Sequence, residues 1–175
     1  GLFLSRIEWN SKNASFNRDE IYKQFQKIAD EVNGKFNVNY SDEIPNVAIF
    51  VSKQNHCLID LLWRVRNGEL KIKVPLIISN HSDLENIAND FNAKFVHIDT
   101  FKTDKSIVED QFLNLLKEYE IDLVVLAKYM QILSDSFLKK FSSIINIHHS
   151  FLPAFKGGQP YHRAWKRGVK LIGAT

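Results

Sequence analysis

The chain has 175 residues, of which 45% are apolar and 13 are phenylalanine, so it can bury the core of one ordinary domain and retain part of another. The net charge at pH 7 is +3 and charged residues make up 25% of the chain, spread along its length, which argues against a nucleic-acid-binding surface. One cysteine, Cys57, excludes an internal disulfide and fits a reducing compartment. No apolar run approaches the ~18 residues that a membrane helix needs, so we expect a cytoplasmic protein.

The N-terminal residues predict a short strand followed by a linker. Leu2–Trp9 is a strand-like run without a partner nearby in the sequence, and the polar residues 10–15 follow it. We therefore place a domain boundary after residue 15, with residues 16–175 forming the main domain. The chain starts and stops within strand-like runs, so we expect both ends to be cut from a longer polypeptide.

Residues 19 to 68 predict two helices and two strands. Apolar residues recur at helical spacing over Asp19–Asn33, and Gly34 follows as the end of the helix. Phe36–Tyr40 alternates as a short strand, and the nearly continuous apolar run Asn46–Val51 is typical of a parallel strand covered on both faces. A second helix ends at Gly68 and buries Leu58, Leu61, Leu62 and Val65.

The rest of the chain continues to alternate strands with helices. We expect strands at Leu76–Ser79 and Phe95–Ile98, and between them a helix that begins with a capping box of Ser82 and Glu85. Asp104 caps the next helix. The last predicted elements are the strand Ile121–Leu126, the helix Ser134–Phe141, the strand Ile144–Ile147 and the helix Pro160–Gly168. This alternation predicts an α/β fold with a Rossmann-like, mostly parallel sheet and helices on both faces, because right-handed crossovers place each helix over the sheet.

Polar chemistry follows the last predicted strand, Ile144–Ile147. Period-two alternation puts Asn146 and His148 on the same face of that strand. The strand opens into a loop that contains proline and glycine, and such strand ends are where open α/β sheets bind ligands. On residue types alone, a turn-forming asparagine and a solvated histidine are the commoner explanation, so the site is a hypothesis at this point.

The longer motif around these residues resembles a known family. NIHHSFLPAF, followed by GG, PYH and KLIGAT, closely resembles the formyltetrahydrofolate deformylases, which share an N-I-H-x-S-x-L-P pattern with the related glycinamide ribonucleotide transformylases. The resemblance implies a formyltransferase-like main domain preceded by an ACT-type regulatory domain, α+β in class, whose last strand would be Leu2–Trp9. It also implies hydrolysis of 10-formyltetrahydrofolate to formate and tetrahydrofolate, which supplies formate for purine synthesis and balances one-carbon pools. Folate and water are then the substrates, and we expect a homo-oligomer.

The same resemblance assigns roles to individual residues. Asn146 would donate its amide N–H to the oxyanion that develops on the formyl group, and His148 would move protons. An aspartate that completes the catalytic set in this family is expected beyond Thr175, so we expect the chain to be inactive by itself. LAKYMQILS resembles the segment that lines the pterin pocket, which makes folate-binding candidates of Met130, Gln131, Ile132 and Leu133. Without the resemblance, a packed connector would be the favoured interpretation of that segment.

The loop after the first buried strand, Ser52–His56 (SKQNH), places backbone N–H groups where an anion could bind. It contains no glycine, and a dinucleotide fingerprint needs Gly-x-Gly-x-x-Gly, so we expect no nicotinamide, flavin or other cofactor. The related transformylases carry a Gly/Ser-rich loop here that holds the phosphate of their acceptor. Its loss, together with His149 in place of a common proline, favours water as the acceptor. Ser52, His56 and Gly157 are therefore substrate-binding candidates, although His56 also fits an ordinary helix start.

The sequence also gives expectations about a metal site and about alternative functions. Cys57, His148, His149 and His162 match no metal-binding spacing, so we predict no metal site. A formyltransferase that uses a formyl-folate donor, and a non-catalytic folate-binding module, stay open as alternatives to the hydrolase.

Overall fold

The computed structural model describes residues 3–10, 17–146 and 160–170. The chain divides into two compact units, Gly1–Glu43 and Ile44–Thr175. This division falls later in the chain than the domain boundary predicted after residue 15, and that boundary stays a prediction because residues 11–16 lie outside the described ranges. Among the helices that the structure describes, none is both long enough and apolar enough to cross a membrane.

The first unit contains one helix, α1 (Arg18–Glu31), in its described residues. Asn17 caps the helix in a capping box: its side chain accepts from the Glu20 backbone N–H at 2.9 Å, and its own N–H donates to the Glu20 carboxylate at 3.0 Å. On one side of α1, Phe25 stacks on Trp9 with ring centroids 5.7 Å apart and on Phe36 at 5.9 Å. The predicted helix over residues 19–33 is thereby confirmed.

Two strands predicted in this unit are not formed. Residues 3–10 and 36–40 have no strand structure, and the side chain of Phe3 is 88% exposed. Alternating apolar residues become a strand only when a second strand satisfies their backbone groups, and no strand is present among the described residues of this unit. The predictions for Leu2–Trp9 and Phe36–Tyr40 were therefore wrong over the described residues.

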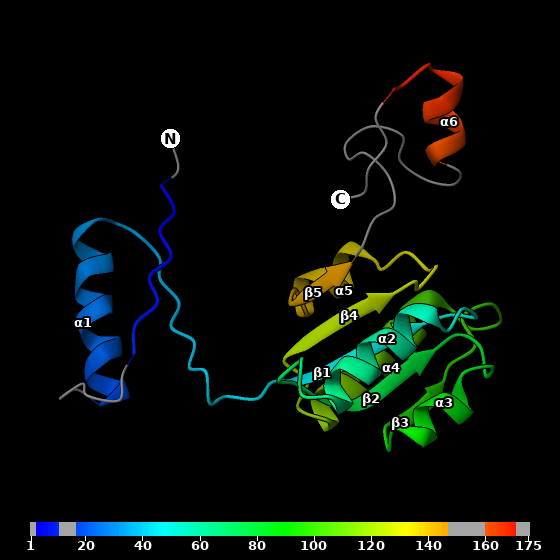
Figure 1. Cartoon of the computed structure of the whole chain (residues 1–175), viewed down its shortest axis with the longest axis horizontal. Coiled ribbons are helices and arrows are strands. Elements are labelled where there is room, and N and C mark those ends of the chain that lie inside the picture. The colour runs from blue at the N-terminus through cyan, green and yellow to red at the C-terminus, as the bar shows by residue number, and fades with distance from the viewer. Residues whose placement is uncertain (1–2, 11–16, 147–159, 171–175) are drawn as a thin grey trace. The chain divides into compact units, whose positions relative to one another are not determined.

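The second unit is built on a five-stranded parallel sheet (Figure 1) with the strand order β3-β2-β1-β4-β5. The strands are β1 (Asn46–Val51), β2 (Lys73–Ser79), β3 (Lys94–His97), β4 (Leu123–Ala127) and β5 (Ile144–Asn146). Central strand β1 pairs with β2 on one edge and with β4 on the other, so that Ile49 lies opposite both Ile77 and Val125. The Rossmann-like parallel sheet predicted from the sequence is confirmed.

Helices cover both faces of this sheet, as predicted. The helices that follow β1–β4 are α2 (His56–Arg66), α3 (Glu85–Asp90), α4 (Lys105–Glu118) and α5 (Asp135–Lys140), and α6 (Pro160–Lys166) comes last. One core cluster joins Ile49 of β1 to α2 and α3, and the other joins Phe50 of β1 to α4 and α5. Adjacent residues of one strand point to opposite faces, so β1 is buried on both sides.

Helix starts were predicted with mixed success. Asp104 and Ser134 do cap α4 and α5 through their side chains. The capping box of Ser82 and Glu85 is wrong: Leu84 occupies the N-cap position without a side-chain bond, and Glu85 N–H bonds to the backbone carbonyl of Ser82. The helix begins too late for the Ser82 hydroxyl to cap it, since a turn precedes it.

Aromatic rings pack against one another on the face of the sheet that α4 and α5 cover. The Phe50 ring meets Phe112 of α4 edge to face with centroids 5.1 Å apart, and meets Tyr129 at 5.4 Å. Phe112 in turn contacts Phe137 of α5 at 6.3 Å. Edge-to-face packing adds to the stabilisation that burial alone supplies. Tyr129 is the first ring beyond β4, so this cluster ties the segment after β4 to the core.

We predict that Phe50→Ala lowers the free energy of unfolding of the second unit by about 3–5 kcal/mol, the usual cost of removing a phenylalanine from a close-packed core. Phe50 is completely buried, whereas Phe101 is 71% exposed, so Phe101→Ala is the matched control and leaves stability nearly unchanged. Urea unfolding followed by tryptophan fluorescence measures both variants. Equal effects of the two substitutions would contradict this description of the core.

Tyr129 gives a pH-dependent prediction. Burial, and secondarily the Glu109 carboxylate, raise the pKa of the Tyr129 hydroxyl well above its ordinary value. Above pH ~10 the unfolded chain releases this proton while the folded chain keeps it, so stability falls as pH rises. Tyr129→Phe removes the group and should lose stability less steeply than wild type between pH ~9 and ~11. Parallel stability curves over that interval would refute the assignment.

Candidate functional site

The strand order reverses direction at β1, and this is where the candidate site lies. The chain runs outward from β1 through β2 to β3, and then crosses back to β4 and β5 on the other side. In open α/β sheets, the loops at the carboxyl ends of the two strands at such a reversal, here β1 and β4, usually frame the crevice where a ligand binds. These loops are residues 52–55 and 128–134.

Ser52 joins the strand ends at this crevice. Its hydroxyl donates to the side-chain carbonyl of Asn80 at 2.7 Å, and it accepts from the backbone N–H of Met130 at 3.3 Å. Ser52 and Asn80 are both buried, and they follow β1 and β2 directly. The Ser52 side chain thus links the ends of β1, β2 and the loop after β4. Its predicted contact with substrate stays a prediction, as does that of His56, which is exposed at the first position of α2.

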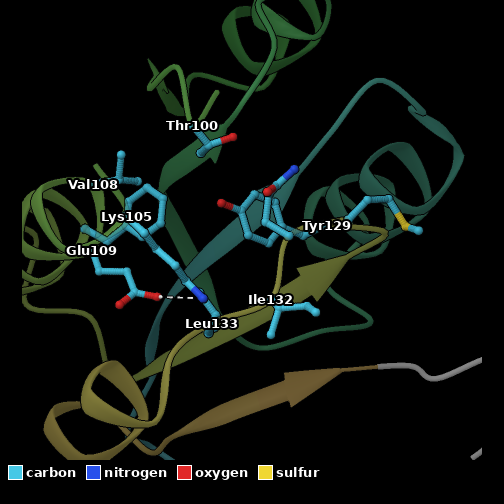
Figure 2. A pocket seen from close by; sticks show the side chains of 10 residues that line it. Thr100, Lys105, Val108, Glu109, Tyr129, Ile132 and Leu133 are labelled. Carbon is cyan, nitrogen blue, oxygen red and sulfur yellow. Dashed lines mark ion pairs between the residues drawn. The ribbon is translucent and has the colours of Figure 1, made fainter. Parts of the chain in front are cut away.

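A pocket of about 310 Å³ opens beside the loop after β4 (Figure 2). One wall comes from α4 and the residues before it, and the other comes from the loop itself. The lining residues are Thr100, Lys105, Val108, Glu109, Phe112, Tyr129, Met130, Gln131, Ile132 and Leu133. All four residues that the resemblance nominated for folate binding therefore line one pocket. Folate binding itself stays a prediction.

The loop residues sit differently in this pocket. The side chains of Met130 and Ile132 are 63% and 85% exposed, and they lie at its mouth. Leu133 is half-buried and packs against the core cluster on the α4 face. The loop backbone also carries N–H and carbonyl groups of the kind that bind flat heterocycles, although the Met130 N–H is bonded to Ser52.

Glu109 is the buried charged group of the pocket. It is only 5% exposed, and it accepts a hydrogen bond from the Ser134 backbone N–H at 2.7 Å and a second from the Ser134 hydroxyl. The ammonium group of Lys105, one turn earlier on α4, lies 3.9 Å from the same carboxylate (Figure 2). Sequence reasoning missed Glu109, although a signal was present: it is an acidic residue next to Val108 in the buried stripe of an amphipathic helix.

Thr100 adds a polar atom without a partner. Its hydroxyl oxygen is buried and has no hydrogen-bond partner among the described residues. Thr100 lies on the opposite side of the pocket from Ile132 and Leu133 (Figure 2). An unpaired buried hydroxyl costs free energy, which rotation of the side chain toward a polar group would recover. The sequence held no signal for this residue, which sits in an irregular loop.

The predicted catalytic residues are described only in part. Asn146 is exposed at the end of β5, where it lies opposite Leu126 of β4. It is thus on the strand next to β4, whose loop lines the pocket. His148 and Gly157 lie outside the described residues, as do Ile147 and His149, so the common face predicted for Asn146 and His148 stays a prediction.

Metal-binding residues do not gather in the described part of the chain. No three histidine, cysteine, aspartate or glutamate side chains come together there in a way that could hold a metal ion. Cys57 is half-buried at the start of α2, and His162 is exposed on α6.

The fold is similar to solved structures of two kinds of enzyme. The structure of a formyltetrahydrofolate deformylase from Pseudomonas syringae superposes with a TM-score of 0.83 at 38% identity, and covers 92% of this chain and 54% of that one. A glycinamide ribonucleotide transformylase from Symbiobacterium toebii superposes with a TM-score of 0.69 at 29% identity, and covers 80% of this chain and 68% of that one.

Curated relatives agree with the first of these. The formyltetrahydrofolate deformylase of Synechocystis sp. is 52% identical over 175 residues, which is 100% of this chain and 62% of that protein. The Bacillus subtilis protein of the same name is 40% identical over 176 residues, which is 100% of this chain and 59% of the relative. The chain therefore spans less than two thirds of the length of the deformylases that it matches.

The match to a known protein family falls on the second unit. The formyl transferase family model matches residues 45–175, which begin one residue after the start of that unit at Ile44. The match includes all five strands of the sheet and the loop that lines the pocket. This chain belongs to the formyl transferase family.

Proposed function

We propose that this chain is the part of a formyltetrahydrofolate deformylase that binds 10-formyltetrahydrofolate and hydrolyses it to formate and tetrahydrofolate. The observation that carries the proposal is the pocket of about 310 Å³ at the carboxyl end of β4, lined by Met130–Leu133. It lies at the reversal of strand order, and Asn146 ends the neighbouring strand. Relatives that align with the whole chain carry the name of this enzyme.

The pocket suits a flat heterocycle with polar edges. Phe112, Tyr129 and Val108 supply an apolar wall, while the loop backbone supplies donors and acceptors. Thr100 lines the pocket, and its buried hydroxyl would reach a polar group of the ligand only by turning toward it. We assign the pteridine of the folate to this pocket, with the formyl group directed toward Asn146.

The chemistry follows from the two side chains of the N-I-H motif. Water adds to the formyl carbon, whose oxygen gains negative charge, and the Asn146 amide N–H donates to that oxygen. His148 takes the proton from the water and delivers one to the folate nitrogen as the carbon–nitrogen bond breaks. Formate and tetrahydrofolate leave. No redox partner or cofactor enters this balance.

A formyltransferase is the alternative, because the fold is also similar to a glycinamide ribonucleotide transformylase. Transfer needs a second site for an amine acceptor. The loop Ser52–His56 has no glycine that would let a phosphate approach its backbone, and the Ser52 hydroxyl is already bonded to Asn80 and Met130. These features favour water. A non-catalytic folate-binding module is the third candidate. We further propose that the enzyme acts in the cytoplasm as a homo-oligomer and supplies formate for purine synthesis.

The choice of acceptor can be tested directly with the complete protein. Incubation with 10-formyltetrahydrofolate should release formate at the same rate with and without glycinamide ribonucleotide, because water is the acceptor in both cases. Formate and formylated ribonucleotide are measured separately by chromatography. Formylated ribonucleotide as the main product would establish the transferase instead, and binding of folate without either product would establish the non-catalytic module.

The role of Asn146 gives a second test. Asn146→Ala in the complete protein should lower kcat for formate release by about 10²–10³, the usual effect of removing one oxyanion donor. Ser142→Ala, which changes an exposed residue four positions earlier, is the control and should leave kcat unchanged. Tetrahydrofolate should bind both variants as it binds wild type. Near-wild-type kcat for Asn146→Ala would remove this residue from the mechanism.

A further inference from the structure

We propose that Glu109 is the positioning residue for the loop Met130–Leu133: its buried carboxylate holds the loop through Ser134 and thereby sets the affinity of the pocket for folate. The inference rests on the proposed function, since it names a residue that determines how well the same pocket binds its ligand. Glu109 acts through another residue and needs no contact with the reacting atoms.

Ser134 is bound to Glu109 through two hydrogen bonds. Both of its donors, the backbone N–H and the hydroxyl, go to the Glu109 carboxylate. The hydroxyl oxygen also accepts from the Phe137 backbone N–H at 3.1 Å, which is the N-cap bond of α5. One carboxylate therefore fixes the residue that directly follows the loop and orients the cap of the next helix. Hydrogen bonds to a charged acceptor are about twice as strong as neutral ones.

Hydrogen bonds hold the loop near its two ends, and the Leu133 side chain packs on the core beside the second of them. At its start, the Met130 N–H bonds to the Ser52 hydroxyl at 3.3 Å, and immediately after it Ser134 bonds to Glu109. Between these anchors, Met130 and Ile132 are 63% and 85% exposed, so side-chain packing contributes little at those positions. The conformation of the backbone between these bonds depends on both of them and on the packing of Leu133.

A loop that is ordered before the ligand arrives lowers the entropy cost of binding. A ligand that bonds to the backbone of a loop must bear the entropy cost of ordering that loop, unless the protein has ordered it already. A buried carboxylate whose partners are supplied by the loop is such a device. Glu109 is only 5% exposed, and the ammonium group of an exposed lysine lies 3.9 Å from its carboxylate. If Ser134 moved, this carboxylate would lose the hydrogen bonds that offset most of the cost of burying its charge. The ordered loop and the buried charge therefore stabilise each other.

The chain provides a matched control in the next residue. The Asp110 carboxylate pairs with the Lys140 ammonium of α5 at 3.3 Å, so it also connects α4 to α5. Both of these side chains are more than half exposed, and neither lines the pocket. An exposed pair of this kind contributes little to stability. Asp110→Ala removes an acidic side chain and an α4–α5 link, and leaves the loop anchor intact.

The experiment compares Glu109→Ala, Glu109→Gln and Asp110→Ala in the complete protein. The Kd for tetrahydrofolate and the KM for 10-formyltetrahydrofolate should rise about tenfold in Glu109→Ala, as two hydrogen bonds to a charged group are lost, whereas kcat at saturation stays within about twofold. Glu109→Gln keeps an acceptor for the Ser134 N–H and should recover most of the affinity. Asp110→Ala should match wild type.

Hydrogen exchange provides an independent reading if Glu109→Ala folds poorly. In Glu109→Gln the Ser134 amide should exchange faster than in wild type, while amides of β1 keep their protection. Unchanged Kd in Glu109→Ala, equal weakening in Asp110→Ala, or a fall in kcat at constant KM would each overturn the inference. If wild type itself fails to bind tetrahydrofolate, the proposed function is refuted. The exchange rate of the Ser134 amide still decides whether Glu109 orders the loop.

Discussion

The pairing of β1 with β2 on one side and β4 on the other is the constraint on which the rest of this unit depends. Residues 47–51 of β1 are all buried, because helices cover both faces of the strand and further strands cover both edges. A strand in that position has no freedom to shift its register, since a slip of one residue would exchange the side chains between two different core clusters. The ends of β1 and β4 are thereby fixed with respect to each other, with Val51 opposite Ala127.

Polar groups can then be placed where the sheet stops. Ser52 directly follows β1, and its hydroxyl lies within hydrogen-bonding distance of groups that are 28 and 78 residues away in the chain. Such bonds have correct geometry only if three strand ends arrive together. On the other side of the loop, Glu109 depends on α4 being packed by Phe112 against the sheet. The pocket is therefore a consequence of core packing, although its own lining is partly exposed.

Sequence reasoning succeeded where the signal was local and strongly periodic. The run Asn46–Val51 and the stripe that begins at Val108 each have one interpretation, because burial on two faces and burial on one helical face give different spacings. It failed for Leu2–Trp9 and Phe36–Tyr40, whose alternation resembles that of real strands. A strand is completed by a partner, and the presence of a partner is not a property of the segment itself.

In the candidate site, too, some residues could be predicted from the sequence and others could not. Met130–Leu133 came from a motif resemblance, since nothing in the residues themselves distinguishes a ligand-lining loop from a packed connector. Glu109 and Thr100 carried no motif, and their roles rest on contacts over long distances in the chain or on the absence of a contact where one is needed. A motif resemblance could therefore nominate the pocket loop, whereas the residues that hold it could be found only from the folded structure.

The same geometry bears on how hydrolysis and transfer can share one fold. In the proposed function, the loop after β4 holds the formyl donor at the reversal of strand order. The loop after β1 is then the acceptor side, where glycine would let a phosphate approach the backbone. In this chain that loop has no glycine, and the Ser52 hydroxyl is engaged within the protein. In the proposed function, a change in this loop selects water as the acceptor, while Ser52 at its start and Glu109 on α4 hold the two ends of the donor loop.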